Sequence, residues 1–281
     1  MEHIVEPKEL QKRMVILRQK GKRIGLVPTM GFLHEGHLSL MRIARSQCDV
    51  LVVSIFVNPT QFAPNEDLDR YPRDFENDKK KCEEEGVDIL FYPTSESMYE
   101  EEYSCWVDEL MLSKGLCGAS RKGHFRGVCT VVAKLFNLVQ PTLAVFGEKD
   151  AQQLRIIERM VRDLYFPIKI IRAPILREPD GLAMSSRNKY LSSEERKQAL
   201  CLQKALKGAL LRFDQGERSS RILKEEMTSE IEKMPLAKID YIEIVDDQNL
   251  TPVNEIKSPV LVALAVEFGK TRLIDNQQLL F

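Results

Sequence analysis

The sequence predicts an α/β protein: a doubly wound parallel sheet followed by a smaller C-terminal α+β domain. Two observations lead to this class. Before Pro174, five short apolar segments alternate with stretches of helical periodicity, which is the pattern of strand–helix–strand units in a parallel sheet. After Pro174, two helical stretches precede antiparallel-looking strands. We place the boundary near residue 176, which gives domains of residues 1–176 and 177–281.

The strands of the larger domain are expected at apolar, largely β-branched segments, as in a sheet buried on both faces. They are residues 24–27, 50–57, 87–92, 143–146 and 168–173. Helices are expected at residues 7–19, 38–46, 73–85, 128–139 and 151–164. We interpret the charged run 78–85 as a solvated helix face. Residues 94–120 carry no pattern that assigns them a role.

The smaller domain begins with a loop of small residues, 180–188, that joins it to the larger one. Helices are expected at residues 193–213 and 219–233, and strands at 238–245 and 260–267. The larger domain is thus Rossmann-like, and we expect the smaller one to close over its ligand site.

The composition limits the class of partner. The chain has 281 residues, of which 43% are hydrophobic, and its 41 basic and 42 acidic residues give a net charge of -1. This balance favours neither nucleic acid nor an anionic membrane as partner. The six cysteines include no Cys-x-x-Cys pair, and no apolar run approaches the roughly 20 residues of a membrane span. We therefore expect a cytoplasmic protein with reduced thiols.

A candidate phosphate site lies where the first strand is followed by a helix. His34 and His37 stand at the expected helix start, beside Gly31 and Gly36. A helix start exposes unpaired N–H groups and the positive end of the helix dipole, which suits phosphate oxygens. The spacing is neither a Walker loop nor Gly-x-Gly-x-x-Gly. An ordinary strand-to-helix turn is the alternative, because proline, glycine and histidine are common there.

Two further segments are expected at the same sheet edge, where open α/β sheets bind ligands. The segment 58–62 follows the second strand and brings amides, and 147–153 follows the fourth and brings Lys149. With Arg187 from the small-residue loop, these groups suit a triphosphate and the charge that grows on it during transfer. The basic, glycine-containing segment 121–127 at another helix start is either a second site of this kind or a flexible surface loop.

Five motifs in chain order carry a resemblance to a known family. They are Pro28-Thr29-Met30-Gly31 with His34-x-Gly36-His37, the segment from Val53 to Phe62, Gly123-His124-Phe125-x-Gly127-Val128, Phe146-Gly147-Glu148-Lys149-Asp150-x-Gln152-Gln153, and the segment from Asp180 to Asn188. Together they resemble the pantoate–β-alanine ligases, and the match spans nearly the whole chain. Five ordered motifs are far more specific than any one of them.

The resemblance implies a carbon–nitrogen ligase that condenses pantoate with β-alanine through a pantoyl adenylate, releasing AMP and diphosphate. It implies ATP as co-substrate and Mg²⁺ carried by the ATP phosphates, with no metal ligands from the protein. It also implies a homodimer built through the larger domain. The chemistry fits the residues, because a carboxylate that attacks a phosphate needs cations and N–H donors to offset the repulsion.

The resemblance also assigns roles to particular residues. His37 corresponds to the proton donor, and His34 also stabilises the adenylation transition state. The residues expected to hold ATP and its phosphates are Met30, Gly31, His34, Gly36, His37, Gly147, Glu148, Lys149, Asp150, Leu176, Met184, Ser185, Ser186 and Arg187. Among these, Lys149, Ser185 and Arg187 are also expected to take part in catalysis. The residues expected at the pantoate and β-alanine end are Gln61, Gln153, Pro28, Thr29 and Asn58.

The chain departs from the family pattern at two positions. Lys122 stands where proline is common, and Ala151 where an aromatic residue is common. We expect a looser loop and a less filled packing position, without loss of activity. Two other functions remain open: a nucleotidyltransferase with the same His-x-Gly-His site, or an ATP-sensing module without turnover.

Overall fold

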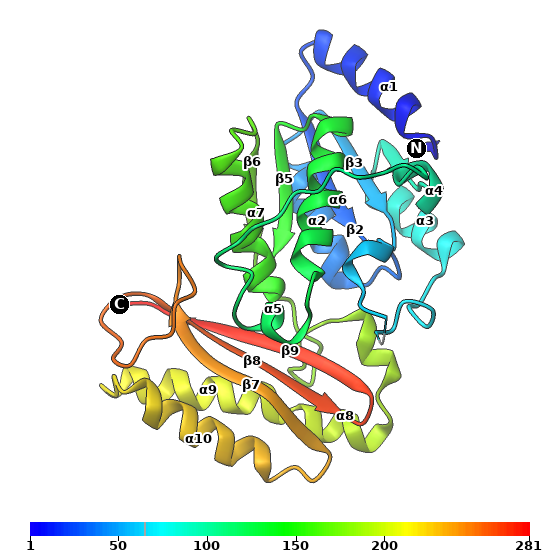
Figure 1. Ribbon diagram of the computed structural model, residues 1–281. Coiled ribbons are helices and arrows are strands. Elements are labelled where there is room, and N and C mark those ends of the chain that lie inside the picture. The colour runs from blue at the N-terminus through cyan, green and yellow to red at the C-terminus, as the bar shows by residue number, and fades with distance from the viewer. Residues whose placement is uncertain (65) are drawn as a thin grey trace. The chain divides into compact units, whose positions relative to one another are not determined.

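The computed structural model describes residues 1–64 and 66–281, which fall into two compact units. The first unit comprises residues 1–110, 121–148 and 153–174, and the second comprises 111–120, 149–152 and 175–281. A parallel sheet in the order β1-β4-β3-β2-β5-β6 organises the first unit, and the antiparallel sheet β7-β8-β9 organises the second (Figure 1). The predicted fold class is confirmed.

The predicted elements up to β6 have bounds close to the expected ones, whereas the short helices η1, α4, α5 and η2 were not predicted. In chain order they are β1 (Glu2–Ile4), α1 (Pro7–Gln19), β2 (Ile24–Thr29), α2 (Glu35–Arg45), β3 (Val50–Ile55), η1 (Pro59–Gln61), α3 (Phe75–Glu84), β4 (Ile89–Phe91), α4 (Ser95–Met98), α5 (Cys117–Ser120), α6 (His124–Val139), β5 (Leu143–Gly147), η2 (Glu148–Asp150), α7 (Ala151–Asp163) and β6 (Lys169–Ala173). The edge strand β1 was not predicted, because only Ile4 of its three residues is buried.

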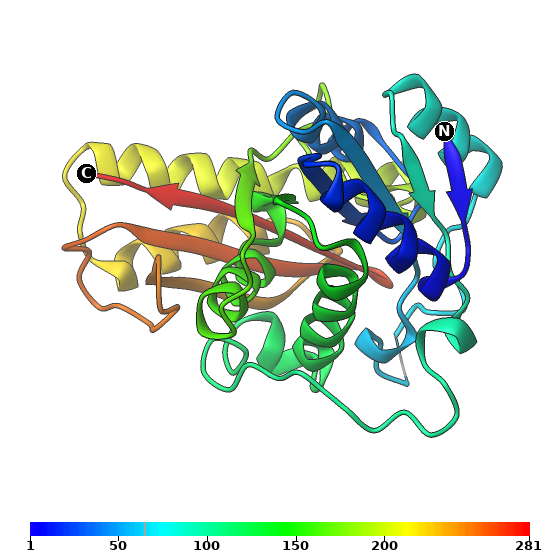
Figure 2. The same ribbon diagram turned by 90° about the horizontal axis from the view of Figure 1, so that it is seen from above.

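Helices cover both faces of the parallel sheet (Figure 2). All six residues of β3 are buried, as its unbroken apolar run predicts. On one face, α2 packs over β2 and β5, where Val27, Val53 and Val145 share a core with Met41 of the helix. α1 and α6 pack against each other, and α6 also contacts β2. The sheet is therefore a rigid support for the loops at its edges.

The interpretation of residues 78–85 as a solvated face is wrong for part of α3. Asp78 is 2% exposed and Cys82 is fully buried. The carboxylate of Asp78 accepts backbone hydrogen bonds from the loop after β2, which offsets the burial of its charge. Periodicity alone does not distinguish a buried carboxylate with backbone partners from a solvated one.

The second unit is a three-stranded sheet with helices α9 and α10 on one face (Figure 1). Its remaining elements are η3 (Ser186–Tyr190), α8 (Ser193–Ala199), α9 (Cys201–Asp214), α10 (Ser220–Glu232), β7 (Ala237–Asp246), β8 (Val260–Phe268) and β9 (Thr271–Leu279). The helix predicted at 193–213 is two helices that meet at Leu200. Strand β9 was not predicted, because its polar residues break the apolar pattern.

All six cysteines are free thiols, and only Cys105 is exposed. Burial raises the pKa of the Cys82, Cys129 and Cys201 thiols to about 12. Among the described residues, no helix combines the length and apolar character that crossing a membrane requires.

Candidate active site

Three of the predicted loops meet at one edge of the parallel sheet. Strands β3, β2 and β5 are neighbours and run parallel, so their carboxyl ends share that edge. The loop 30–37 follows β2, the segment 58–62 follows β3, and Gly147 ends β5. The chain order reverses across β2, since β3 lies on one side and β5 on the other. Such a switch point opens the crevice in which α/β sheets bind ligands.

His34 and His37 form the start of α2. His34 is the extended residue before the first turn, and its N–H donates to Nδ1 of His37 at 3.3 Å. The two rings lie 4.0 Å apart between centroids. Because Nδ1 of His37 accepts this bond, the proton of its neutral ring is on Nε2. The helix start therefore presents an N–H donor from an imidazole at its positive end.

The loop before these histidines is held by α3. Gly31 and Phe32 both have left-handed backbone, with φ of 82° and 51°. The N–H groups of Phe32 and Leu33 donate to the two oxygens of Asp78 at 2.6 and 2.7 Å. Lys81 Nζ donates to the carbonyl of Leu33 at 2.6 Å. Burial raises the pKa of Asp78, although the backbone bonds and Lys81 act in the opposite direction.

Gln61 lies beside the loop that carries the histidines. Its Nε2 donates to the sulfur of Met30 at 2.9 Å, and its Oε1 accepts from Nδ2 of Asn58 at 3.2 Å. Asn58 is 1% exposed, and its amide also contacts the Gly127 carbonyl and the Tyr99 hydroxyl. A direct contact of Asn58 with substrate would require one of these bonds to be exchanged. In this structure Asn58 shapes the turn that carries Gln61.

The segment 121–127 contacts the turn that carries Gln61 through His124 and Gly127, which argues against a loose surface loop. His124 is 9% exposed, with Nδ1 lying 2.8 Å from the carbonyl oxygen of Gln61 and Nε2 lying 3.0 Å from Arg121. A guanidinium only donates, so Nε2 accepts and Nδ1–H donates to the carbonyl. A Cβ on Gly127 would lie 2.4 Å from the carbonyl oxygen of Thr60. The glycine permits this close approach.

An ion pair between Arg121 and Glu66 also holds the segment 121–127. Both oxygens of Glu66 accept from Arg121, at 2.7 and 2.6 Å. Burial raises the pKa of Glu66, but the hydrogen bond and charge of Arg121 outweigh it, so the net shift is downward. Lys122 is exposed and follows directly after the anchored Arg121.

In the second unit, the loop 176–190 is ordered by its own hydrogen bonds. The N–H of Met184 donates to the carbonyl of Leu176 at 3.0 Å, and Oγ of Ser185 accepts from the N–H of Arg187 at 3.3 Å. The side chain of Asn188 donates to the Ala183 carbonyl at 3.0 Å. This is the predicted phosphate-binding loop, and these hydrogen bonds join its two ends.

The predicted site residues divide between the units. The first unit contains Pro28, Thr29, Met30, Gly31, His34, Gly36, His37, Asn58, Gln61, Gly147, Glu148 and Gln153. The second contains Lys149, Asp150, Leu176, Met184, Ser185, Ser186 and Arg187. Thr29 Oγ1 donates to the Ser54 carbonyl and accepts from the N–H of Gly31, so it shapes the loop. The carbonyl of Lys149 accepts from Asn276 at 3.0 Å.

Sequence reasoning missed several residues that build the site. Asp78, Lys81, Tyr99 and Glu66 hold its loops from other elements, and Glu66 does so through Arg121 of the segment that the sequence had singled out. Asp78 and Lys81 lie in a run with the pattern of a charged helix face, so no local signal separates them from their neighbours. Within residues 1–64 and 66–281, no group of three or more His, Cys, Asp or Glu side chains could hold a metal ion.

A parallel sheet with a histidine-bearing helix start at its switch point defines a nucleotide-binding α/β protein. The comparison with family models narrows this class. The pantoate–β-alanine ligase model matches residues 2–278, and the chain belongs to that family.

Named relatives agree with this assignment. The pantothenate synthetase of Thermotoga neapolitana is 59% identical over 268 residues, covering 95% of this chain and 96% of the relative. A crystal structure of the enzyme from Thermus thermophilus has a TM-score of 0.94 at 44% identity, with 99% of each chain covered. The Francisella tularensis ligase, solved in complex with β-γ ATP and β-alanine, has a TM-score of 0.80 at 35% identity, covering 99% of this chain and 97% of that one.

Proposed function

We propose that this chain uses ATP to join pantoate to β-alanine, giving pantothenate, AMP and diphosphate through a pantoyl adenylate. One observation carries the proposal within the family. The helix start of His34 and His37 and the amide of Gln61 share one sheet edge, where Gln61 lies 2.9 Å from Met30 of the histidine loop. The helix start proposed to bind phosphate and the Gln61 side-chain amide proposed to bind pantoate are thus neighbours. The Francisella ligase, which was solved with an ATP compound and β-alanine bound, also supports these substrates.

In the first step, a carboxylate oxygen of pantoate attacks the α-phosphorus of ATP. The bond from that phosphorus to the bridging oxygen breaks, and diphosphate leaves with the electron pair. N–H groups at the start of α2 and Nε2–H of His37 donate to phosphate oxygens, where negative charge accumulates. The bond from the His34 N–H keeps Nδ1 of His37 as an acceptor, so Nε2 carries the donated proton.

In the second step, the amine of β-alanine attacks the acyl carbon of the adenylate. The carbon–oxygen bond to AMP breaks, AMP leaves with the electron pair, and the attacking nitrogen loses a proton to water. Gln61 and Gln153 orient pantoate, and Pro28, Thr29 and Asn58 shape that end of the site. Mg²⁺ carried by the ATP phosphates would offset part of their charge.

The other predicted site residues supply the groups for the rest of ATP. Lys149, Ser185 and Arg187 act on the leaving diphosphate, because cations and a hydroxyl there offset the charge that develops on it. The adenosine and phosphate contacts come from Gly147, Glu148, Asp150, Leu176, Met184 and Ser186. Closure of residues 177–281 over the site, assembly as a homodimer and a cytoplasmic location stay predictions from the sequence.

Pyrophosphate exchange separates this function from its alternatives. With pantoate alone, the purified protein should exchange labelled diphosphate into ATP, and pantothenate should form only when β-alanine is added. No exchange with pantoate would reject the proposal. A nucleotidyltransferase would instead transfer AMP to another acceptor, and an ATP-sensing module would bind ATP without releasing AMP.

A further inference from the structure

We propose that Asp78 is a positioning residue for adenylation, because its carboxylate fixes the loop that places His34 and His37. The inference rests on the proposed function and adds to it a residue of α3 that lies outside all five sequence motifs. Asp78 does not touch the reacting atoms in this proposal. It acts through the backbone of Phe32 and Leu33.

The loop has a conformation that needs outside support. Gly31 and Phe32 are both left-handed, and phenylalanine adopts such a backbone rarely. Because of this backbone, the successive N–H groups of Phe32 and Leu33 both point toward the same carboxylate. Successive N–H groups of this kind form a concave anion site, and here the protein's own Asp78 occupies it.

Helix α3 holds the loop through both kinds of backbone group. Each oxygen of Asp78 accepts one N–H, at 2.6 Å from Phe32 and 2.7 Å from Leu33. One turn further along, Lys81 donates to the carbonyl of Leu33 at 2.6 Å. The peptide groups on both sides of Leu33 are therefore fixed by α3.

The position of Leu33 connects this clamp to the histidines. Its carbonyl group belongs to the same peptide as the N–H of His34, and that N–H donates to Nδ1 of His37. A rotation of this peptide would move the donor that holds the His37 ring. Asp78 and Lys81 thus set the backbone that orients the ring.

The buried charge itself favours a role beyond packing. Asp78 is 2% exposed, and an ionised carboxylate is unfavourable at such a place unless its oxygens are hydrogen-bonded. An apolar side chain would fill the space without that requirement, but it would take the Asp78 acceptor from the buried N–H of Leu33 and the partly buried N–H of Phe32. The carboxylate suits a loop whose conformation has to be defined.

The test compares Asp78→Asn with Asp74→Asn. Asparagine keeps the shape of Asp78 but offers one acceptor oxygen, so one of the two N–H groups faces an amide NH₂. Asp74 caps the same helix by accepting from the N–H of Asn77, and asparagine caps a helix about as well, so its variant removes an equal charge from α3 and leaves the clamp intact. The measurements are pantoate-dependent diphosphate–ATP exchange, reaction of preformed pantoyl adenylate with β-alanine, and thermal unfolding.

Asp78→Asn should lower kcat of the exchange about 10- to 100-fold and change KM for ATP and pantoate less than about threefold, as for misplaced catalytic groups. Its reaction with preformed adenylate should fall less than about threefold, because the histidines act on phosphate. Asp74→Asn should exchange within about twofold of wild type. Equal loss of exchange in both variants, or a change in KM alone, would show a merely structural role and overturn the inference.

If Asp78→Asn does not fold, Lys81→Met is measured in the same way. It removes the bond to the Leu33 carbonyl and the positive charge near Asp78, and it should lower the exchange kcat about three- to tenfold. If this variant or a folded Asp78→Asn exchanges diphosphate at the wild-type rate, the inference about Asp78 is wrong, but the proposed function is not affected. Wild-type protein without pantoate-dependent exchange overturns the proposed function as well, so the two failures are distinguishable.

Discussion

Two helix starts in the first unit have similar sequences and different surroundings. Both α2 and α6 begin beside a glycine and a histidine. At α2, His37 is half-buried and its Nδ1 contacts the backbone of the same helix start. At α6, His124 is buried, and its ring reaches the Gln61 carbonyl of a distant turn. The pattern of glycine and histidine predicts a helix start in both places, but long-range packing decides whether the imidazole serves the ligand or the scaffold.

The largest expected effect is on His37. His37→Ala should lose about 2–4 kcal/mol of transition-state stabilisation, because it removes a donor aimed at developing charge. Its unfolding free energy should change little, since the ring is half-buried. Steady-state rates and urea unfolding check both parts, and Ser39→Ala on the same helix is the matched control. Wild-type turnover by His37→Ala would show that His37 takes no part in the mechanism and that it does not differ from His124 in serving the ligand.

The next largest effect is expected on stability, from the packing of α6 against the turn that carries Gln61. Gly127→Ala should lower the unfolding free energy by about 1–3 kcal/mol, because its Cβ would lie 2.4 Å from the Thr60 carbonyl oxygen. The displaced turn carries Gln61, so KM for pantoate should also rise. Gly208→Ala in α9 is the control, since nothing lies within 4 Å of its Cβ and alanine favours helix. Equal stability of the two variants would contradict the close packing of α6 on the turn.

The smallest effect concerns the ion pair that holds Arg121. The pKa of Glu66 in the folded protein is below its ordinary 4.5, so the unfolded state binds more protons in acid. The stabilisation is therefore complete above about pH 5 and is lost as the pH falls through the folded-state pKa. Glu66→Gln should lower the unfolding free energy by about 1 kcal/mol at pH 7 and by less at pH 4.

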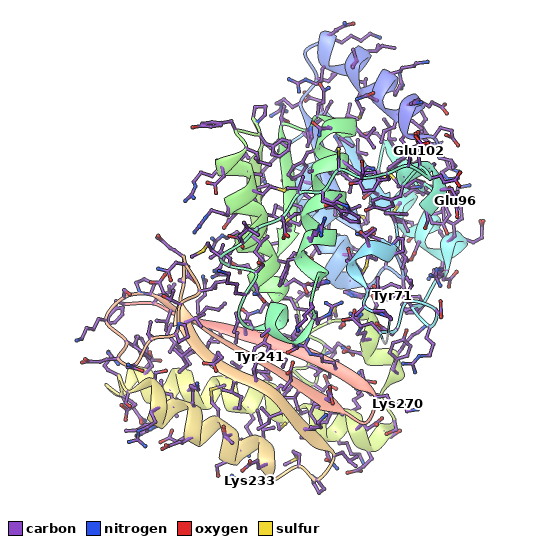
Figure 3. The ribbon with its side chains drawn as sticks, viewed as in Figure 1. Tyr71, Glu96, Glu102, Lys233, Tyr241 and Lys270 are labelled. Atoms are coloured by element: carbon purple, nitrogen blue, oxygen red, sulfur yellow. The ribbon has the colours of Figure 1, made fainter. Side chains whose placement is uncertain are left out.

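Urea unfolding at the two pH values measures this difference. Glu102, which is exposed at the surface of the first unit, provides a matched substitution (Figure 3). Glu102→Gln should show no such change between pH 7 and pH 4 relative to wild type. If Glu66→Gln loses the same unfolding free energy relative to wild type at both pH values, the ion pair does not titrate as proposed.

The parallel sheet and the loops at its carboxyl edge follow from the amino-acid sequence alone. The continuous apolar run of β3 requires burial on both faces, and its position between helical stretches requires a crossover. Those two constraints place residues 58–62 on the same edge as His34 and His37. The five motifs then identified the family, which the comparison with the family model confirms.

Which polar residues support the site depends instead on how the elements pack. Asp78 and its exposed neighbours in α3 have the same local pattern, and they differ only in facing the backbone of residues 32–33. Strand β9 mixes polar residues with Leu273 and Leu279, which are buried in the core, and it pairs with β8 along its whole length. In both cases the partner lies outside the element itself. Local periodicity records which face of an element is apolar, whereas a hydrogen bond between separate segments depends on how the elements pack.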